Sequence, residues 1–247
     1  MNDDNDLIID LAHVSKLYKM GNVIVPALTD ASLLIQSGEM VSIVGPSGSG
    51  KSTLMNVLGC LDVPTSGKYL LRNEDVSQMN DNRLAKIRNA QIGFIFQTYN
   101  LLPRLTALSN VELPLLYGDG MNSKARCVQA LERVGLGERV NHKPSELSGG
   151  EQQRVGIARA IVKQPTLILA DEPTGNLDSH SSNEIVGILQ DLNKVENLTV
   201  VIVTHDLEVA NCTDRIISMR DGRITDDSRV QNPRWLRTLN PDSFGDK

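Results

Sequence analysis

The sequence lacks a long hydrophobic run and a basic amino-terminal leader. No stretch of it approaches the roughly 18 consecutive apolar residues that cross a bilayer as a helix. The first ten residues, MNDDNDLIID, are too acidic for a secretory signal peptide. We therefore expect a soluble cytosolic chain with no membrane span of its own.

Cysteine is scarce, and neither sign of charge is in large excess. Cys60, Cys127 and Cys212 lie far apart and form no CxxC pair, so we expect free thiols that fill the core in a reducing compartment. The formal net charge of −5 argues against nucleic acid as the main partner. A length of 247 residues suits one large domain, or a core with a subdomain.

Apolar segments alternate with amphipathic ones along most of the chain. LIIDLAHVSKLY and ASLLIQ predict strands of a β layer, while EMVSIVG, TLILADEP and LTVVIVTH predict buried strands. Two helices are predicted from apolar residues spaced i, i+3, i+4, i+7: one contains Leu54, Val57, Leu58 and Leu61 and stops at DVPTSG, and the other contains Ile185, Ile188, Leu189 and Leu192. Helices that alternate with apolar strands predict an α/β fold with a parallel sheet.

The remaining segments suggest how this fold is divided. Residues 101–143 have a helical and loop-like pattern, with Ser123 as the N-cap of KARCVQALERVGL. DRIISMRDGRIT predicts a hairpin that turns at Asp221-Gly222. We expect a discontinuous core of residues 5–97 and 161–225, an inserted helical subdomain at 98–160 and a tail at 226–247. The tail is either loose or holds a short docking helix anchored by Trp235.

A phosphate-binding loop follows the buried strand EMVSIVG. The segment GPSGSGKST has the spacing G-x-x-x-x-G-K-[ST], in which glycines let backbone N–H groups point at phosphate oxygens. Lys51 would hold the β- and γ-phosphates, and the Ser52 hydroxyl would complete magnesium coordination. The loop comprises Gly45, Pro46, Ser47, Gly48, Ser49, Gly50, Lys51, Ser52 and Thr53.

Two adjacent acids end the later strand LILA. Asp171 is placed to support magnesium, and Glu172 to act as a general base toward water, because ligands bind at the carboxyl ends of strands in α/β sheets. An ordinary strand end or helix cap is the alternative interpretation of these acids. Beside a phosphate loop, the catalytic interpretation is favoured.

Three single residues are further candidates for nucleotide or magnesium contacts. His205, after TVVIV, can contact a γ-phosphate or the attacking water, whereas His13, His142 and His180 are interpreted as structural. Gln97, after IGFIF, can ligate magnesium through its amide oxygen. Tyr18 can stack on an adenine ring, or it can simply pack in the fold.

A second glycine-rich element, ELSGGEQQR, opens a predicted helix. Each glycine costs a helix about 1 kcal/mol relative to alanine, so Gly149 and Gly150 in the first turn require a reason. One reason is close approach to an anion, which the free N–H groups at a helix start favour. The chain already has a phosphate loop about a hundred residues earlier, so this element raises the question of a second phosphate contact.

Taken together and in order, these motifs resemble the nucleotide-binding subunit of ATP-binding cassette (ABC) transporters. The resemblance rests on GPSGSGKST, Gln97, LSGGEQQR, LILADEP, NLD and His205, and it covers roughly residues 5–225. GFIFQTYNLLPRLTALSNVELPLLY and ADEPTGNLDS narrow it to the macrolide-export and lipoprotein-releasing ATPases. It implies a P-loop NTPase core with a mixed, largely parallel sheet, an N-terminal antiparallel β layer and an inserted helical subdomain.

The resemblance also implies roles for residues. Tyr18 would stack on adenine, Gln97 would sense magnesium, and His205 would contact the γ-phosphate. Ser148, Gly149 and Gly150 would contact ATP held by a second copy, and Asp178 would cross the dimer interface. Each glycine-rich element would then bind a different nucleotide.

The implied partners are a second copy and an integral membrane permease, with a periplasmic or extracellular adaptor reached through that permease. The chain would hydrolyse Mg-ATP at the cytoplasmic face of the membrane and drive export or lipoprotein and lipid extraction. Cell-division-type signalling without cargo is an alternative, and a soluble ABC protein acting on ribosomes or DNA is a more distant one. Leucines within residues 97–116 are either subdomain core or the docking site for the permease: Leu101, Leu102, Leu105, Leu108, Leu113, Leu115 and Leu116, with Val111.

Overall fold

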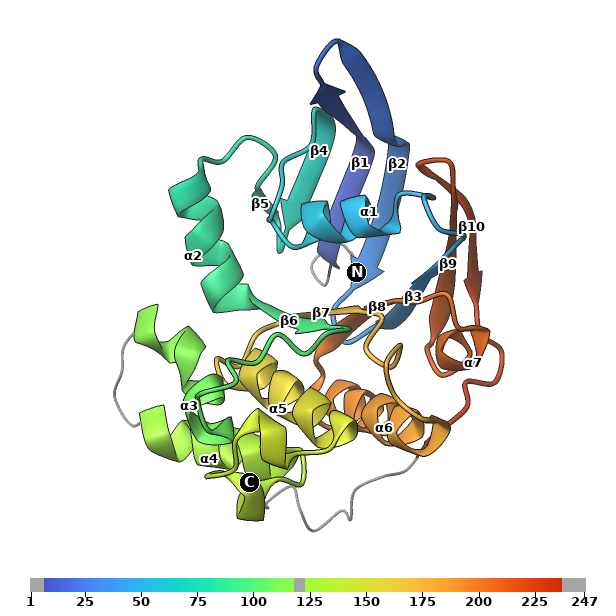
Figure 1. Ribbon diagram of the computed structural model, residues 1–247. Coiled ribbons are helices and arrows are strands. Elements are labelled where there is room, and N and C mark those ends of the chain that lie inside the picture. The colour runs from blue at the N-terminus through green and yellow to red at the C-terminus, as the bar shows by residue number, and fades with distance from the viewer. Residues whose placement is uncertain (1–6, 118–122, 237–247) are drawn as a thin grey trace, which may run out of the picture.

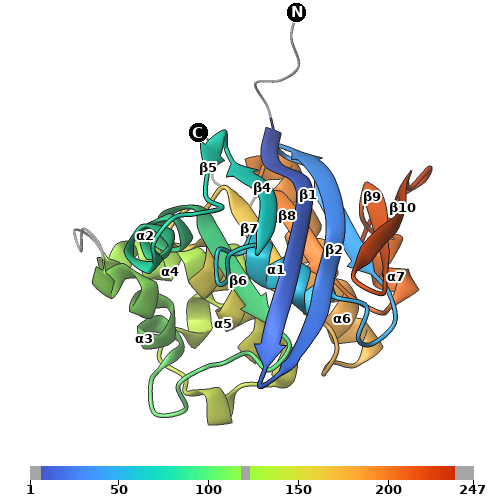
Figure 2. The same cartoon turned by 90° about the horizontal axis from the view of Figure 1, so that it is seen from above.

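The computed structural model describes residues 7–117 and 123–236, which form two sheets with helices between and below them (Figure 1). The smaller sheet is antiparallel, with the strand order β2-β1-β4-β5. Its strands are β1 (Leu7–Met20), β2 (Val23–Gln36), β4 (Ser66–Leu71) and β5 (Glu74–Asp75). This sheet is the predicted N-terminal β layer, and Figure 2 shows it curving over α1.

The larger sheet has the order β10-β9-β3-β8-β7-β6. Its neighbours from β9 to β6 are parallel, and β10 pairs antiparallel with β9. The strands are β3 (Met40–Val44), β6 (Ile92–Phe96), β7 (Leu167–Asp171), β8 (Thr199–Val203), β9 (Arg215–Arg220) and β10 (Arg223–Arg229). The predicted turn is confirmed: Asp221 and Gly222 both have positive φ, as a type I′ hairpin requires.

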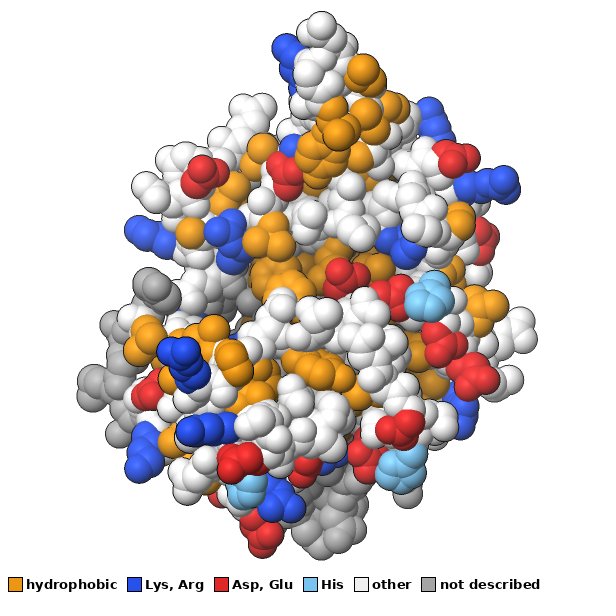
Figure 3. Space-filling view, viewed as in Figure 1, with side chains coloured by type: hydrophobic (Ala, Val, Ile, Leu, Met, Phe, Trp, Pro, Cys, Tyr) orange, Lys and Arg blue, Asp and Glu red, His pale blue; other side chains and the backbone are white. Residues whose placement is uncertain are grey.

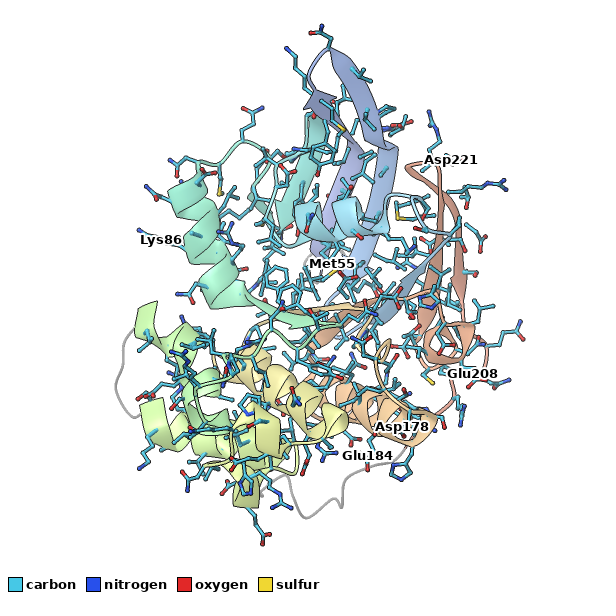
Figure 4. The ribbon with its side chains drawn as sticks, viewed as in Figure 1. Met55, Lys86, Asp178, Glu184, Glu208 and Asp221 are labelled. Atoms are coloured by element: carbon cyan, nitrogen blue, oxygen red, sulfur yellow. The ribbon has the colours of Figure 1, made fainter. Side chains whose placement is uncertain are left out.

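Helices cover both faces of the larger sheet. On one side α1 (Lys51–Leu58) lies between the two sheets; on the other lie α5 (Gly149–Ile161) and α6 (Ser179–Glu196). Arg154 of α5 pairs with Glu184 of α6 at 2.8 Å, and Figure 4 labels the latter. The other helices are α2 (Asp81–Gln91), α3 (Ala107–Glu112), α4 (Ser123–Arg133) and α7 (Leu207–Ala210), with 3-10 turns η2 (Leu113–Tyr117), η3 (Gly137–Arg139) and η4 (Pro144–Glu146).

The alternation of side chains along the central strands divides the core in two. Leu167 and Leu169 of β7 pack with α1 and the antiparallel sheet. Ile168 and Ala170, which point to the opposite face, pack with α3, α4, α5 and α6. The helices of residues 98–160 therefore share one core with the sheet.

Several local details differ from the sequence-based expectations. Helix α1 ends at Leu58, so Leu61 lies outside it and is 49% exposed. Helix α4 begins at Ser123, whose hydroxyl donates to Glu112 Oε1 at 2.8 Å, so Ser123 is the first helical residue and not the predicted N-cap. Of the predicted docking leucines, Leu115 is buried whereas Leu102 and Leu116 are exposed, which favours the core interpretation for part of this set.

The expected tail is ordered where the structure describes it. Strand β10 continues to Arg229, beyond residue 226, because its ladder with β9 extends that far. The Arg234 backbone N–H donates to Asn211 O, and the buried Gln190 side chain binds both Arg234 O and the Leu236 N–H. The Lys194 ammonium lies over the Trp235 ring in a cation–π contact, and the segment around Trp235 is not helical. Residues 237–247 lie outside the described residues.

Candidate functional site

The predicted catalytic residues meet because four parallel strands end at one edge of the sheet. The register aligns Phe96 with Asp171 and Asp171 with Val203, and Val203 with Ile43. Gln97 and Glu172 come one residue after Phe96 and Asp171, the phosphate loop begins two residues after Ile43, and His205 lies two residues after Val203. The sheet therefore brings together residues spread over more than half of the sequence.

The phosphate loop, residues 45–53, wraps around a cavity of about 770 Å³. Gly50 has φ +100, and a Cβ there would lie 2.7 Å from Ala27 O, so only glycine suits this position. Gly48 has φ +78 and faces open space, which leaves its backbone accessible to a ligand. Lys51 Nζ donates to Gly45 O and Pro46 O at 2.7 and 2.9 Å, so the ammonium already lies over the loop.

The same cavity contains the other predicted groups of this site. It is lined by Val25, Pro26, Ala27, Gly45, Pro46, Ser47, Gly48, Ser49, Gly50, Lys51, Ser52, Thr53, Gln97, Asp171, Glu172, Val203 and His205. The sequence analysis missed Val25, Pro26 and Ala27, because an apolar stretch inside a strand has no motif. They extend the cavity from the phosphate loop toward the β1–β2 hairpin.

The two acids differ in their surroundings. Burial, then the neighbouring Glu172 charge, raises the pKa of Asp171, while Lys51 acts in the opposite direction. Glu172 adopts a left-handed backbone conformation with φ +45, which is strained for a residue with a side chain. Its N–H donates to Val203 O at 2.8 Å, which holds the residue across the gap between β7 and β8.

His205 and Glu172 form a pair at the mouth of the cavity. His205 Nδ1 lies 2.7 Å from Glu172 Oε1, and Thr204 Oγ1 lies 3.4 Å from Glu172 Oε2. The hydrogen bond to Glu172, followed by that carboxylate's charge, raises the pKa of His205. The arrangement can hold a proton between an acid and an imidazole beside the phosphate loop.

The donor set around the loop suits magnesium. Ser52, Gln97 and Asp171 offer a hydroxyl, an amide and a carboxylate oxygen to one cavity, and Mg²⁺ prefers oxygen ligands. A cation there would also offset the free-energy cost of burying the charged Asp171 carboxylate. Gln97 is held by Asn176, which donates to its backbone oxygen at 3.0 Å, and by Gly175, where a Cβ would lie 2.6 Å from Gln97 Nε2.

The start of helix α5 has structural roles within the chain in addition to the predicted contact with an anion. Ser148 caps α5, and it exchanges hydrogen bonds with Glu151 in a capping box. A Cβ on Gly149 would lie 3.0 Å from Tyr99 Oη, and one on Gly150 would lie 3.1 Å from Ser181 Oγ. Both glycines therefore also allow close packing within the chain.

Ser148, Gly149, Gly150 and Asp178 stand apart from the phosphate loop. In the described part of the chain, none of them lines the loop cavity. Asp178 caps α6 by accepting from the N–H groups of His180 and Ser181, and these bonds lower its pKa (Figure 4). The structure thus gathers one group of predicted residues around the loop and leaves a second group elsewhere on the same chain.

Tyr18 lies on β1 beside this site but does not line the cavity. It pairs across the ladder with Val25, which does. Its hydroxyl donates to Asp62 Oδ2 at 2.9 Å. Exposed hydrophobic side chains surround the tip of this hairpin, where Met20, Val23 and Ile24 are each more than 60% exposed (Figure 3).

Gln153 of α5 is a connection that the sequence analysis missed. It is fully buried, and its Nε2 donates to Phe96 O at 3.2 Å and to Pro173 O at 2.6 Å. These carbonyls adjoin Gln97 and Glu172. The sequence does offer one indication of this contact: Gln153 is a polar residue on the face of the helix that packs in the core, and a buried polar side chain must find hydrogen-bond partners.

A phosphate loop between a buried parallel strand and a helix, with two acids ending a nearby strand, defines a P-loop nucleoside triphosphatase. The chain belongs to the ABC transporter family, whose model matches residues 28–175. It is an ATP-binding ATPase subunit of this family, and its mixed α/β fold confirms the predicted fold class.

Relatives from several organisms are similar to this chain over most of its length. An uncharacterized ABC transporter ATP-binding protein of Bacillus subtilis, YvrO, is 52% identical over 90% of this chain and 97% of its own length. The macrolide export ATP-binding/permease protein MacB of Syntrophobacter fumaroxidans is 48% identical over 90% of this chain, which spans only 32% of that protein.

A solved structure shows the same architecture. The ATP-binding cassette MJ0796 of Methanocaldococcus jannaschii, in a dimeric post-hydrolysis state bound to ADP and Pi, is 46% identical and has a TM-score of 0.82. The match covers 91% of this chain and 99% of that one. Within residues 7–117 and 123–236, no helix has the length and apolar character needed to traverse a bilayer.

Proposed function

We propose that the chain hydrolyses ATP as a homodimer and drives a separate membrane permease in export or in lipoprotein and lipid extraction. The observation that carries this proposal is the separation of Ser148–Gly150 from the chain's own phosphate loop. A second copy, turned to face the first, would place each helix start against the nucleotide of its partner. The dimeric state of the similar cassette MJ0796 supports this arrangement.

The residues around the loop would then have distinct tasks. The loop N–H groups and Lys51 bind the phosphates, and Glu172 accepts a proton from the attacking water, a role worth about 10²–10⁴ in rate. His205 orients Glu172 and contacts the γ-phosphate. Ser52, Gln97 and Asp171 would hold Mg²⁺, which supplies charge neutralisation of the phosphates when bound. Ser148, Gly149, Gly150 and Asp178 act toward the partner copy.

A groove beside the site is the surface that we propose for the permease. The phenylalanine groove has a volume of about 660 Å³ and includes Phe94 and Phe96, whose rings stack at 5.8 Å. Basic side chains surround it: Lys86, Arg88, Arg159 and Lys163. An apolar helix of the permease with acidic residues beside its apolar face would match this groove in shape and charge. Only Asn100 and Pro114 of residues 97–116 line it.

This assembly would place the chain at the cytoplasmic face of the membrane, attached through the permease. ATP would stabilise the closed dimer, and hydrolysis would remove that stabilisation and let the dimer open. The difference in the affinity of ATP for the closed and open states would be the free energy available to move the permease. An adaptor outside the membrane would be reached through the permease. The macrolide-export name of one relative supports an export role.

The experiment that tests this function measures dimerisation of a hydrolysis-deficient variant. We expect Glu172→Gln to form dimers with Mg-ATP and to stay monomeric with Mg-ADP, as measured by light scattering after gel filtration. The matched variant Glu172→Gln/Ser148→Asp keeps an N-cap side chain but places a carboxylate against the partner's phosphates. It should bind ATP and remain monomeric. A Glu172→Gln chain that stays monomeric with Mg-ATP, even beside its permease, contradicts the proposal.

A further inference from the structure

We propose that Asp62 is a positioning residue that, together with Lys16, fixes the Tyr18 ring as the platform for the nucleotide base. This inference rests on the proposed function, in which Tyr18 stacks on adenine. It assigns a task to two residues, Asp62 and Lys16, that belong to none of the motifs around the phosphate loop. The task is to hold the ring before the nucleotide arrives.

The Asp62 carboxylate is the centre of a compact hydrogen-bonded cluster. Oδ2 accepts from the Tyr18 hydroxyl at 2.9 Å. Oδ1 accepts from Lys16 Nζ at 2.5 Å and from the Val63 N–H at 2.8 Å. Burial alone would raise the pKa of Asp62, but the bonds from Lys16, Tyr18 and Val63 leave it lowered, so the carboxylate is ionised at neutral pH.

Lys16 restricts the ring from a second direction. Its ammonium lies 5.1 Å from the Tyr18 ring centroid and also donates to Val63 O at 2.8 Å. Only 11% of the Lys16 side chain is exposed, so this cation cannot move freely. One side of the ring therefore carries a fixed positive charge, which an aromatic face attracts. In the proposed complex the base stacks on the opposite face.

The cluster joins the base platform to the phosphate loop. Asp62 follows α1 by four residues, and α1 begins at Lys51 of the loop. Tyr18 is on β1, opposite Val25, a lining residue of the loop cavity. The bond between Tyr18 and Asp62 thus ties the hairpin to the helix that carries the phosphate-binding residues, and it sets the distance between the base and phosphate subsites.

A ring that is already fixed loses less conformational freedom when it stacks on a base, so the tether should strengthen binding of the base alone. The test compares Mg-ADP, which carries a base, with inorganic pyrophosphate, which does not. Isothermal titration calorimetry of the full chain gives both dissociation constants. We expect Tyr18→Ala to weaken ADP binding about tenfold, as loss of an aromatic stack does, and to leave pyrophosphate binding unchanged.

Two tether variants then separate positioning from stacking. Tyr18→Phe keeps the ring and removes only its hydroxyl, and Asp62→Ala removes the carboxylate; each should weaken ADP binding about three- to fivefold without affecting pyrophosphate. Tyr18 also has a side-chain hydrogen bond with Thr53, so the double variant can be somewhat weaker than Asp62→Ala. Its loss of ADP affinity should nevertheless be smaller than the sum of the two single losses, because both changes break the Tyr18–Asp62 bond. In steady-state assays the KM for ATP should rise while kcat is retained.

The matched control is Glu74→Ala, which removes the carboxylate of an exposed ion pair with Arg83 on the same sheet. It should change neither dissociation constant. If Tyr18→Ala weakens ADP binding while Tyr18→Phe does not, the positioning role is wrong and the stacking role stands. Equal loss of ADP and pyrophosphate binding in Tyr18→Phe also overturns the inference. If Tyr18→Ala itself has no effect, both the base platform and its positioning are wrong.

Discussion

At the scale of single residues, the site depends on side chains that hold one another in place. Glu172 occupies a strained backbone conformation, and its carboxylate is bonded to His205. Strain of this kind persists only where the surrounding structure fixes it, here through the N–H bond to Val203 O. The position of the carboxylate is therefore determined by β8 as well as by its own strand.

The pairing of His205 with Glu172 gives a titration that can be followed directly. We expect Glu172→Gln to lower the pKa of His205 toward its ordinary value of about 6.5, because the main cause of the raised pKa is then lost. Lys51 and Asp206, the other charges that act on it, stay in place. NMR of the imidazole protons measures this, with His205→Gln assigning the signal. An unchanged pKa contradicts the pairing.

The same pair has a consequence for stability. The folded state holds the His205 proton more tightly than the unfolded chain does, so the pair stabilises the fold fully below the unfolded pKa. This contribution is lost as pH rises through the raised pKa of the folded state. We expect the wild type to lose slightly more unfolding free energy than His205→Gln between about pH 6 and pH 8. Urea denaturation at each pH measures the difference.

Sequence reasoning located the residues of the phosphate loop but not all of their partners. Lys51, Asp171 and Glu172 line one cavity because each lies at or after the carboxyl end of a strand of the same sheet. Those strands are recognisable in the sequence as short apolar runs. Ser148 and Asp178 are helix caps, a role that their positions before GGEQQR and SHSS also indicate. The bond between Tyr18 and Asp62 joins residues 44 positions apart, and no local pattern predicts such a contact.

At the scale of elements, helix α5 connects the glycine-rich start to the ends of two strands. Its buried Gln153 donates to Phe96 O and Pro173 O, and the helix packs against β6 through an apolar face. A displacement of α5 must therefore move the backbone beside Gln97 and Glu172. In the proposed dimer, contact of the helix start with a partner copy would be transmitted to Gln97 and Glu172 by this route.

A pair of matched substitutions tests this connection. Gln153→Leu and Gln190→Leu each remove a buried amide that donates to two backbone carbonyls. Each should lower the free energy of unfolding by about 2–4 kcal/mol, because each variant loses two hydrogen bonds to backbone carbonyls in the core. Only Gln153→Leu should also lower kcat, by about tenfold or more, since Gln190 is bonded to the segment around Arg234. Equal kcat in both variants contradicts the proposed route.

Periodicity predicted the elements more reliably than their ends. Helix α6 was predicted from four apolar residues that all prove to be buried. Helix α1 stops at Leu58, before the predicted fourth residue Leu61, because Gly59 ends it and the chain turns. Strand β10 passes the expected start of the tail, since TDDSR is polar and exposed on an edge strand and so has no apolar signal.

At the scale of the whole molecule, the larger sheet has a hydrophobic core on each of its faces. The face toward α1 supports the phosphate loop, and the face toward α5 and α6 supports the helices of residues 98–160. The phenylalanine groove lies where α2, β6 and α5 meet. A partner seated there would contact residues adjoining Gln97, so binding in the groove and occupancy of the cavity would be coupled.

A charge reversal at the rim of the groove tests the docking surface. Lys86 is exposed on α2, as Figure 4 shows, and it lines the groove. We expect Lys86→Glu to reduce co-purification with the permease by about fivefold or more, because it repels acidic residues of the docked helix. The ATPase activity of the isolated chain should stay unchanged. Lys124→Glu, an exposed change on α4 away from the groove, is the control.

The central place of β3 has a consequence for how the chain is synthesised. This strand pairs Met40 with Val200 and Val41 with Arg215, so both of its neighbours leave the ribosome long after it does. Contacts this distant in sequence form slowly, and β3, whose five residues are all buried in the folded chain, lacks both neighbouring strands until then. A nascent chain that ends before β8 should therefore aggregate or require a chaperone, and it should acquire nucleotide binding only when synthesis is nearly complete.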